Sequence, residues 1–228
     1  MLKDFLSQLI KHNVKNNPRF KYHWQCDKLQ ISHLCFADDL LLLFHGDLEY
    51  ANVMKDSLAQ FYDFTRLLAN NDKSNLFFSG TEEHIANVIC QELHFNKGTF
   101  PVKYLGVPLI TSKLKKSDCD DFVNKISSHL LSWTSKSLSY TGRLQLIQSV
   151  IARIQNYWAE LFILPKSVLK QVESLIRRFL WTGGIDKAHG AKVAWEAVCK
   201  PKKEGGLGLK NLAQLNNVLN LKHIWNIF

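Results

Sequence analysis

The chain centres on Ile31-Ser32-His33-Leu34-Cys35-Phe36-Ala37-Asp38-Asp39-Leu40-Leu41-Leu42-Leu43-Phe44, an apolar stretch with two adjacent carboxylates in its middle. Each apolar arm is short, rich in large side chains and compatible with a β-strand. The two arms therefore predict two buried strands joined by a tight turn, with Asp38 and Asp39 at the bend.

Two neighbouring carboxylates repel each other, so a fold tolerates them at an open surface or beside a divalent cation. Mg²⁺ suits the second case, because it prefers oxygen ligands and is often shared between one or two carboxylates and substrate phosphates. The first case is a solvated turn, which aspartate favours in any event. The pair by itself leaves both interpretations open.

Phe36-Ala37-Asp38-Asp39 resembles the Phe/Tyr-x-Asp-Asp signature of reverse transcriptases, and further blocks follow it in the family's order. The whole sequence resembles the reverse transcriptases of plant LINE-type, non-LTR retrotransposons. The blocks that carry the resemblance are His33 to Phe44, Ala69-Asn70 with Lys73-Ser74, Lys103 to Leu109, Trp133, Leu138 to Ile147, Leu164-Pro165-Lys166, Phe179 to Gly183, Ala194-Trp195-Glu196 and Gly205 to Leu209. So many blocks in one order indicate common ancestry.

The resemblance implies RNA-templated DNA synthesis at a nicked-DNA primer. The implied partners are an RNA template, a DNA primer, their RNA-DNA hybrid and deoxynucleoside triphosphates. Mg²⁺ would be held chiefly by Asp38 and secondarily by Asp39. The resemblance also assigns Lys73 to protonating the departing pyrophosphate, and Tyr104-Leu105-Gly106 to the primer grip, where a close backbone approach favours glycine. The alternatives are an exposed lysine at a helix end and a plain hairpin turn.

The same resemblance predicts that this chain does not polymerise by itself. In the family, a further catalytic aspartate and the fingers region precede the hairpin, and nothing in residues 1–30 matches that aspartate. Two-metal phosphoryl transfer needs carboxylates on both sides of the ion pair. We therefore expect a fragment with weak or absent Mg²⁺ binding. Two alternatives remain, a non-catalytic basic nucleic-acid-binding module and a non-functional transposon relic.

Periodicity and the resemblance together predict an α+β fold in three segments. Residues 1–112 form a partial palm, with a short antiparallel sheet that includes the Asp-Asp hairpin and a covering helix that ends at Asn70 and has Leu68 on its apolar stripe. A short strand is expected at 75–78, and a short strand or a tight turn at 104–107. Residues 113–184 form an all-helical thumb, with helices at 118–131, 141–158 and from Pro165 to Gly183. Residues 185–228 form a connector toward a zinc-binding segment that the family has and this sequence lacks.

The formal net charge of +9 arises from one part of the chain. Between Phe122 and Lys203 there are thirteen Lys or Arg residues against four acids, and the remainder holds sixteen of each. Residues 122–159 contain no acid at all, which favours contacts with nucleic-acid phosphates over an ordinary solvated face. The candidate contact residues are Lys136, Arg143, Arg153, Lys166, Lys170, Arg177 and Arg178. Helical spacing places those after Lys136 on outer faces, opposite apolar stripes that include Ile154.

The composition, 46% hydrophobic and 21% charged, is that of a soluble domain. Leu40 to Phe44 is too short to cross a bilayer, and the charged N-terminus has no signal-peptide pattern. We therefore expect an intracellular protein, nuclear or cytoplasmic, without membrane contact. Five scattered cysteines fit reduced thiols, and His84, Cys90 and His94 lack the spacing of a structural zinc site.

Overall fold

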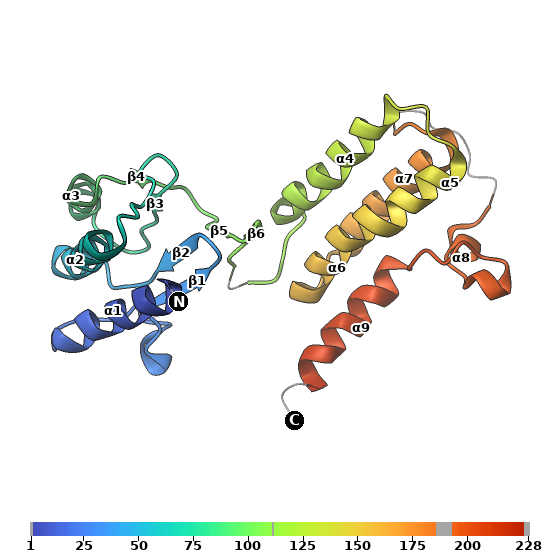
Figure 1. The fold of residues 1–228 in the computed structure, drawn as a ribbon. Helices are drawn as coiled ribbons and strands as arrows, with labels where there is room; N and C mark the ends of the chain where they lie inside the picture. The colour runs from blue at the N-terminus through green and yellow to red at the C-terminus, as the bar shows by residue number, and fades with distance from the viewer. Residues whose placement is uncertain (1, 111, 186–192, 226–228) are drawn as a thin grey trace. The chain divides into compact units, whose positions relative to one another are not determined.

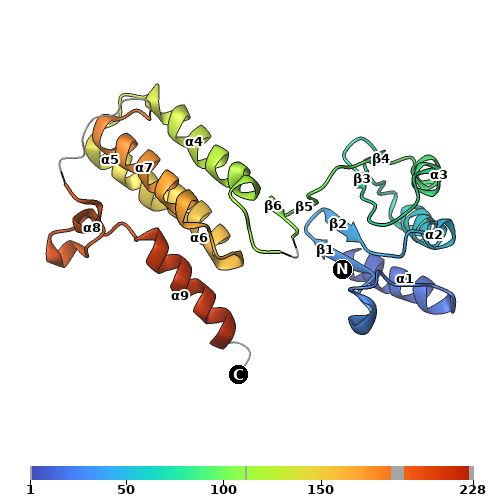
Figure 2. The same cartoon turned by 180° about the vertical axis from the view of Figure 1, so that it is seen from behind.

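The computed structural model describes residues 2–110, 112–185 and 193–225 of the chain. The chain divides into two compact units, Met1–Leu109 and Ile110–Phe228 (Figure 1, Figure 2). The first unit combines helices with small sheets, and the described part of the second unit is helical. The predicted α+β class is therefore confirmed.

Residues 2–110 contain three α-helices and three two-stranded sheets. The helices are α1 (Leu2–Asn16), α2 (Leu48–Thr65) and α3 (Glu83–Leu93). The antiparallel hairpins are β1 (His33–Phe36) with β2 (Asp39–Leu42) and β5 (Lys103–Tyr104) with β6 (Val107–Pro108), while β3 (Asn75–Leu76) runs parallel to β4 (Asn96–Lys97).

Two buried apolar clusters hold the first unit together. The first joins α1, α2 and β2, because α1 carries an apolar residue every fourth position on one face. Its members are Leu6, Ile10, Val14 and Met54, with Leu40 and Leu42 packed against them. The second cluster, Ala51, Ile89 and Leu93, joins α2 to α3. The predicted helix α2 therefore covers the hairpin, and α1 covers the same face.

The end of α2 differs from the prediction. The helix ends at Thr65, because Arg66 adopts a left-handed backbone conformation (φ 59°) and its N–H donates to the Tyr62 carbonyl at 2.7 Å. Leu68, which we expected on the apolar stripe of this helix, lies beyond its end and is 76% exposed. The left-handed cap at Arg66 thus ends the helix although the apolar periodicity continues to Leu68.

Two further elements of the first unit were not predicted correctly. α3 lies in a segment for which the sequence analysis predicts no helix, although Ala86, Ile89 and Leu93 recur at helical spacing and are buried. The strand expected at 75–78 is shorter, since only its first two residues pair, in parallel with β4.

The second unit is built on α4 (Asp120–Thr134), α5 (Tyr140–Leu146), α6 (Ala152–Leu161), α7 (Lys166–Thr182), α8 (Trp195–Val198) and α9 (Leu212–Trp225). α4 packs against α7, and α6 packs against α9 (Figure 1). The larger side chains buried between these helices are Phe122, Ile126, Leu130, Ile151, Val168, Val172, Phe179 and Leu180. In the part of the chain that the structure describes, no helix is both long and apolar enough to cross a membrane.

Sequence signals set the ends of two of these helices. α7 begins after Pro165, whose missing N–H suits a helix start, and ends at Gly183 with φ 74°, as predicted. Ser139 caps α5, because its Oγ accepts a hydrogen bond from the Gly142 N–H at 3.2 Å. The described part of the expected connector packs on this bundle through α9, while residues 186–192 and 226–228 of it lie outside the described ranges.

The helix predicted at 141–158 is not regular. Ile147–Ile151 form a π-helical turn between α5 and α6, and the wider turn rotates the side chains that follow it. Gln155 is consequently buried, with 5% exposure, whereas Ile154 of the predicted apolar stripe is only half-buried. Gln148 in this turn donates from Nε2 to the Leu207 carbonyl at 2.9 Å, which ties the turn to the segment before α9.

Asn216 joins α9 to the end of α6. Its Oδ1 accepts a hydrogen bond from the Leu164 backbone N–H at 2.9 Å. Its Nδ2 donates to the carbonyls of Ala159 and Phe162, at 3.1 and 2.6 Å. Carbonyls at a helix end have no partner within the helix, so this side chain, 2% exposed, supplies one.

Replacing Asn216 with alanine should lower the free energy of unfolding by about 2 kcal/mol, because the buried Leu164 N–H loses its acceptor. Its exposed neighbour provides the control: Asn217→Ala should change stability by less than about 0.5 kcal/mol. Denaturant unfolding followed by tryptophan fluorescence compares the two variants. Equal unfolding midpoints would show that Asn216 does not hold α9 to α6.

Candidate functional site

The β1–β2 hairpin presents both predicted metal ligands. Phe36 pairs with Asp39, so Ala37 and Asp38 form a two-residue turn between the strands. The hairpin is as predicted, but only Asp38 lies at the bend, because Asp39 is the first residue of β2. Both aspartate side chains are exposed.

The two faces of this hairpin differ in their surroundings. Cross-strand partners point to the same face of a sheet. One face carries His33, Cys35, Leu40 and Leu42, and the other carries Leu34, Phe36, Asp39 and Leu41. Leu40 and Leu42 pack on the cluster formed by α1 and α2, while Leu34 and Phe36 are 40% and 59% exposed. Asp39 therefore projects from the open apolar face.

The turn of the hairpin is strained at Ala37, whose φ is 48°. The left-handed region costs a residue with a Cβ atom roughly 1–2 kcal/mol. Backbone strain of this kind clusters at functional sites, and here it immediately precedes Asp38. An alanine does not signal a positive φ in a sequence, so sequence reasoning missed this feature.

The β5–β6 hairpin carries a second predicted segment, and its Tyr104 lies near Asp39 of the acidic hairpin. Burial raises the pKa of the Tyr104 phenol, and the neighbouring Cys35 and Asp39 side chains raise it further. Leu105 and Gly106 form the turn of this hairpin, with φ of 55° and 77°. Two left-handed residues in succession are typical of a tight two-residue hairpin turn.

Gly106 has a backbone angle that favours glycine, while the close backbone approach expected of a primer grip stays a prediction. A Cβ atom added at Gly106 would meet no other atom within 4 Å. Glycine suits the position because it adopts a positive φ without a steric penalty.

Lys73 lies in an exposed turn between α2 and β3. Its backbone N–H donates to the carbonyl and to Oδ1 of Asn70, at 3.2 and 3.1 Å. These contacts are local and include neither Asp38 nor Asp39. The structure therefore does not join Lys73 to the two hairpins, and its role near a triphosphate stays a prediction.

Asp38 and Asp39 offer oxygen ligands of the kind that Mg²⁺ prefers. Within residues 2–110, 112–185 and 193–225, however, no three His, Cys, Asp or Glu side chains gather closely enough to hold a metal ion together. A two-metal phosphoryl-transfer site needs carboxylates on both sides of the ion pair. The described residues thus provide half of such a donor set and do not complete it.

Four of the predicted phosphate-contacting residues are exposed, namely Lys136, Arg153, Lys166 and Lys170. Lys166 and Lys170 are both in the first part of α7 and are four residues apart. Residues at this spacing lie on the same side of a helix. These two lysines therefore form a small cationic surface on α7.

The other three predicted contact residues do not point freely into solvent, which corrects the expectation from helical spacing. Arg143 Nη1 donates to the Phe179 carbonyl at 3.3 Å, and Arg178 Nη1 donates to the Ile185 carbonyl at 3.1 Å. The Arg177 guanidinium lies 5.5 Å from the ring centre of Trp195. Arginine is attracted to helix-end carbonyls and aromatic faces, and its length lets it reach them from an outer face.

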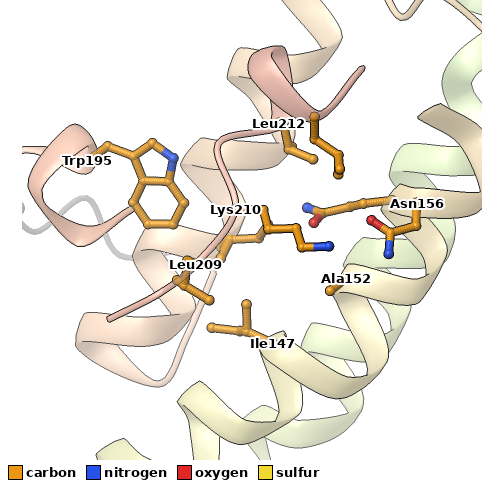
Figure 3. A pocket seen from close by; sticks show the side chains of 10 residues that line it. Ile147, Ala152, Asn156, Trp195, Leu209, Lys210 and Leu212 are labelled. Carbon is orange, nitrogen blue, oxygen red and sulfur yellow. The ribbon is translucent and has the colours of Figure 1, made fainter. Parts of the chain in front are cut away.

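A pocket lies in the second unit beside the π-helical turn (Figure 3). It has about 350 Å³ of empty volume, solvent at its mouth included. Lys210 extends toward Asn156 across it (Figure 3). Gln155 Nε2 and Asn156 Oδ1 are buried and have no hydrogen-bond partner among the described residues. None of the site residues predicted from the sequence lines this pocket.

No protein-family model matches the chain. It is similar to an Arabidopsis thaliana protein named "Putative ribonuclease H protein", with 32% identity over 121 residues, which are 53% of this chain and 20% of that protein. It is also similar to an Arabidopsis thaliana protein named "Uncharacterized mitochondrial protein", with 33% identity over 72 residues, which are 31% of this chain and 47% of that protein. The matches thus span about a fifth of the first relative and about half of the second.

Proposed function

We propose that this chain is part of the reverse transcriptase of a LINE-type, non-LTR retrotransposon, a plant transposable element. The observation that carries the proposal is the hairpin with Asp38 at its bend and Asp39 beside it, next to the hairpin that holds Tyr104. The ordered blocks in the sequence support it, as does the similarity to a plant protein named for ribonuclease H. The parent reaction is RNA-templated DNA synthesis.

In this proposal one hairpin binds the metal ion and the other positions the primer. Asp38 at the bend and Asp39 on the open face are the Mg²⁺ ligands, and Mg²⁺ supplies charge stabilisation to the phosphates when it is bound. Tyr104, Leu105 and Gly106 position the end of the primer. Because the described residues complete only half of the donor set, the proposal assigns no polymerisation to this chain alone.

The second unit serves as the nucleic-acid-binding part. Its exposed residues Lys136, Arg153, Lys166 and Lys170 provide cations for the phosphates of an RNA-DNA hybrid. Arg143, Arg177 and Arg178 instead hold helices and loops of this unit together. We accordingly assign phosphate contacts to the first four residues only.

A second candidate function is a non-catalytic nucleic-acid-binding module. The incomplete donor set around Asp38 and Asp39 favours it, because the exposed lysines act without any metal. Both candidates require hybrid binding by the second unit, and only the first requires the two carboxylates.

Binding of an RNA-DNA hybrid at several salt concentrations tests the shared requirement. The logarithm of the affinity should fall linearly with the logarithm of the salt concentration, by about 0.9 for each phosphate contacted. The double variant Lys166→Gln, Lys170→Gln should reduce the steepness of that line by about 2, because two cationic contacts are lost. Fluorescence anisotropy of a labelled hybrid gives both quantities.

The control for this experiment is Lys222→Gln, whose ammonium already pairs with Glu160 at 3.1 Å. This variant should keep the salt dependence of the unaltered chain. A salt-independent affinity, or equal effects of the double variant and the control, would contradict phosphate binding by α7.

A further inference from the structure

The segment between α1 and β1 forms an exposed lobe that the proposed function does not use. It projects from the helices and sheets of the first unit (Figure 1). Trp24, in a turn of this segment, is 75% exposed. An exposed tryptophan on an ordered turn is unusual enough to require a reason, because tryptophan is highly buried on average.

The lobe is held firmly where it leaves the fold. Phe20 packs edge-on against Tyr22 and Tyr50, with ring centres 5.2 and 5.5 Å apart. The Lys21 carbonyl accepts a hydrogen bond from the His45 N–H at 3.0 Å. These contacts tie the base of the lobe to α2 and to the strand end after β2.

The turn that carries Trp24 is ordered as well. The Cys26 N–H donates to the His23 carbonyl at 2.7 Å, and the Ile31 N–H donates back to the Cys26 carbonyl at 3.1 Å. The Trp24 ring lies against the His23 ring, with ring centres 5.9 Å apart and an angle of 34° between the planes. The outer face of the Trp24 ring is therefore presented by a fixed turn rather than by a loose loop.

The lobe is also cationic, although the first unit contains most of the acids of the chain. Residues 17–32 contain three Lys or Arg residues and a single acid, Asp27. Arg19 and Lys21, which precede the tryptophan in the sequence, and Lys28, which follows it, are exposed. A flat aromatic surface between exposed cations matches a nucleobase between phosphates.

We propose that this lobe binds a single-stranded nucleic acid, with an unpaired base stacked on Trp24 and the neighbouring phosphates on Arg19, Lys21 and Lys28. The inference rests on the proposed function, to which it adds a single-strand site separate from the hybrid site on α7. Single strands fit this lobe better than duplexes, because the bases of a duplex already stack on one another and present only their edges.

The test measures the affinity of the full chain for a labelled single-stranded 12-mer, with Trp24 replaced by Ala, Phe or Leu. Removal of one base-aromatic stack should weaken binding by about 5- to 150-fold in Trp24→Ala. Trp24→Phe should retain most of the affinity because it keeps a ring. Trp24→Leu should bind as weakly as Trp24→Ala, since leucine keeps apolar area but has no π-face.

The matched control is Trp225→Ala, because Trp225 is 83% exposed and lies on α9. The Trp225→Ala variant should bind the single strand with the affinity of the unaltered chain. Unchanged binding by Trp24→Ala would overturn the inference. Full binding by Trp24→Leu would also overturn it, and would indicate an apolar protein surface as the partner of Trp24.

The hybrid experiment on α7 separates this inference from the proposed function. Normal hybrid binding together with no effect of Trp24→Ala on the single strand would overturn the lobe site alone. If the unaltered chain did not bind the hybrid, the proposed function would be contradicted. The effect of Trp24→Ala on the affinity for the single strand would still decide the role of the lobe.

Discussion

Primer extension on an RNA template should depend on Asp38. We expect no incorporation by the chain alone, and Mg²⁺-dependent incorporation when it is mixed with a palm and fingers fragment that carries the family's further aspartate. Asp38→Asn should lower that incorporation by about 10²-fold or more, because the metal ion it helps to hold contributes several kcal/mol. Uptake of a labelled deoxynucleoside triphosphate on a poly(rA) template with an oligo(dT) primer measures the effect.

The control for this assay is Asp63→Asn, because Asp63 is an exposed carboxylate on α2 of the same unit. It should leave incorporation by the mixture unchanged. Equal activity of Asp38→Asn and Asp63→Asn would show that Asp38 is not a metal ligand of the proposed site. No incorporation by the mixture, with hybrid binding intact, would favour the non-catalytic binding module.

Phe179→Ala should destabilise the second unit by about 4 kcal/mol. Phe179 is fully buried in α7, and its ring centre lies 5.8 Å from that of Trp133 on α4. Replacing it with alanine removes the apolar contacts of a whole ring and leaves a cavity between the two helices. Urea unfolding followed by tryptophan fluorescence reports mainly on this unit, because five of the six tryptophans lie in it.

Leu131→Ala serves as the comparison for Phe179→Ala, because Leu131 is on α4 but is 47% exposed. It should cost less than about 1 kcal/mol, since little area returns to water. If both variants shifted the urea midpoint equally, the contact between α4 and α7 would not be the core of this unit.

Helix positions in the second unit were predictable because strong local signals agree with the apolar periodicity. Pro165 and Gly183 fix both ends of α7, and Phe122, Ile126 and Leu130 are buried on one stripe of α4 as spacing indicates. The hairpin at Ala37 was predictable for the same reason, since two short apolar arms flank a pair of turn-forming aspartates.

The errors occur where a contact distant in sequence, or a local backbone feature, overrides periodicity. The π-helical turn at Ile147–Ile151 changes which side chains are buried after it, and no residue type marks such a turn. Arg143 was placed by helical spacing on an outer face, but its guanidinium reaches a carbonyl 36 positions along the chain. Trp24 was not singled out, because exposure cannot be read from a lone aromatic residue.

The acidic hairpin consists of two strands of four residues each, and a hairpin of that size is not stable alone. Its shape depends on Leu40 and Leu42, which pack against Ile10 and Met54. The orientation of the two carboxylates therefore depends on α1 and α2, which contribute no residue to the proposed site. Under the proposed function, a substitution at Ile10 or Met54 that displaced this hairpin would disturb the site as effectively as the loss of an aspartate.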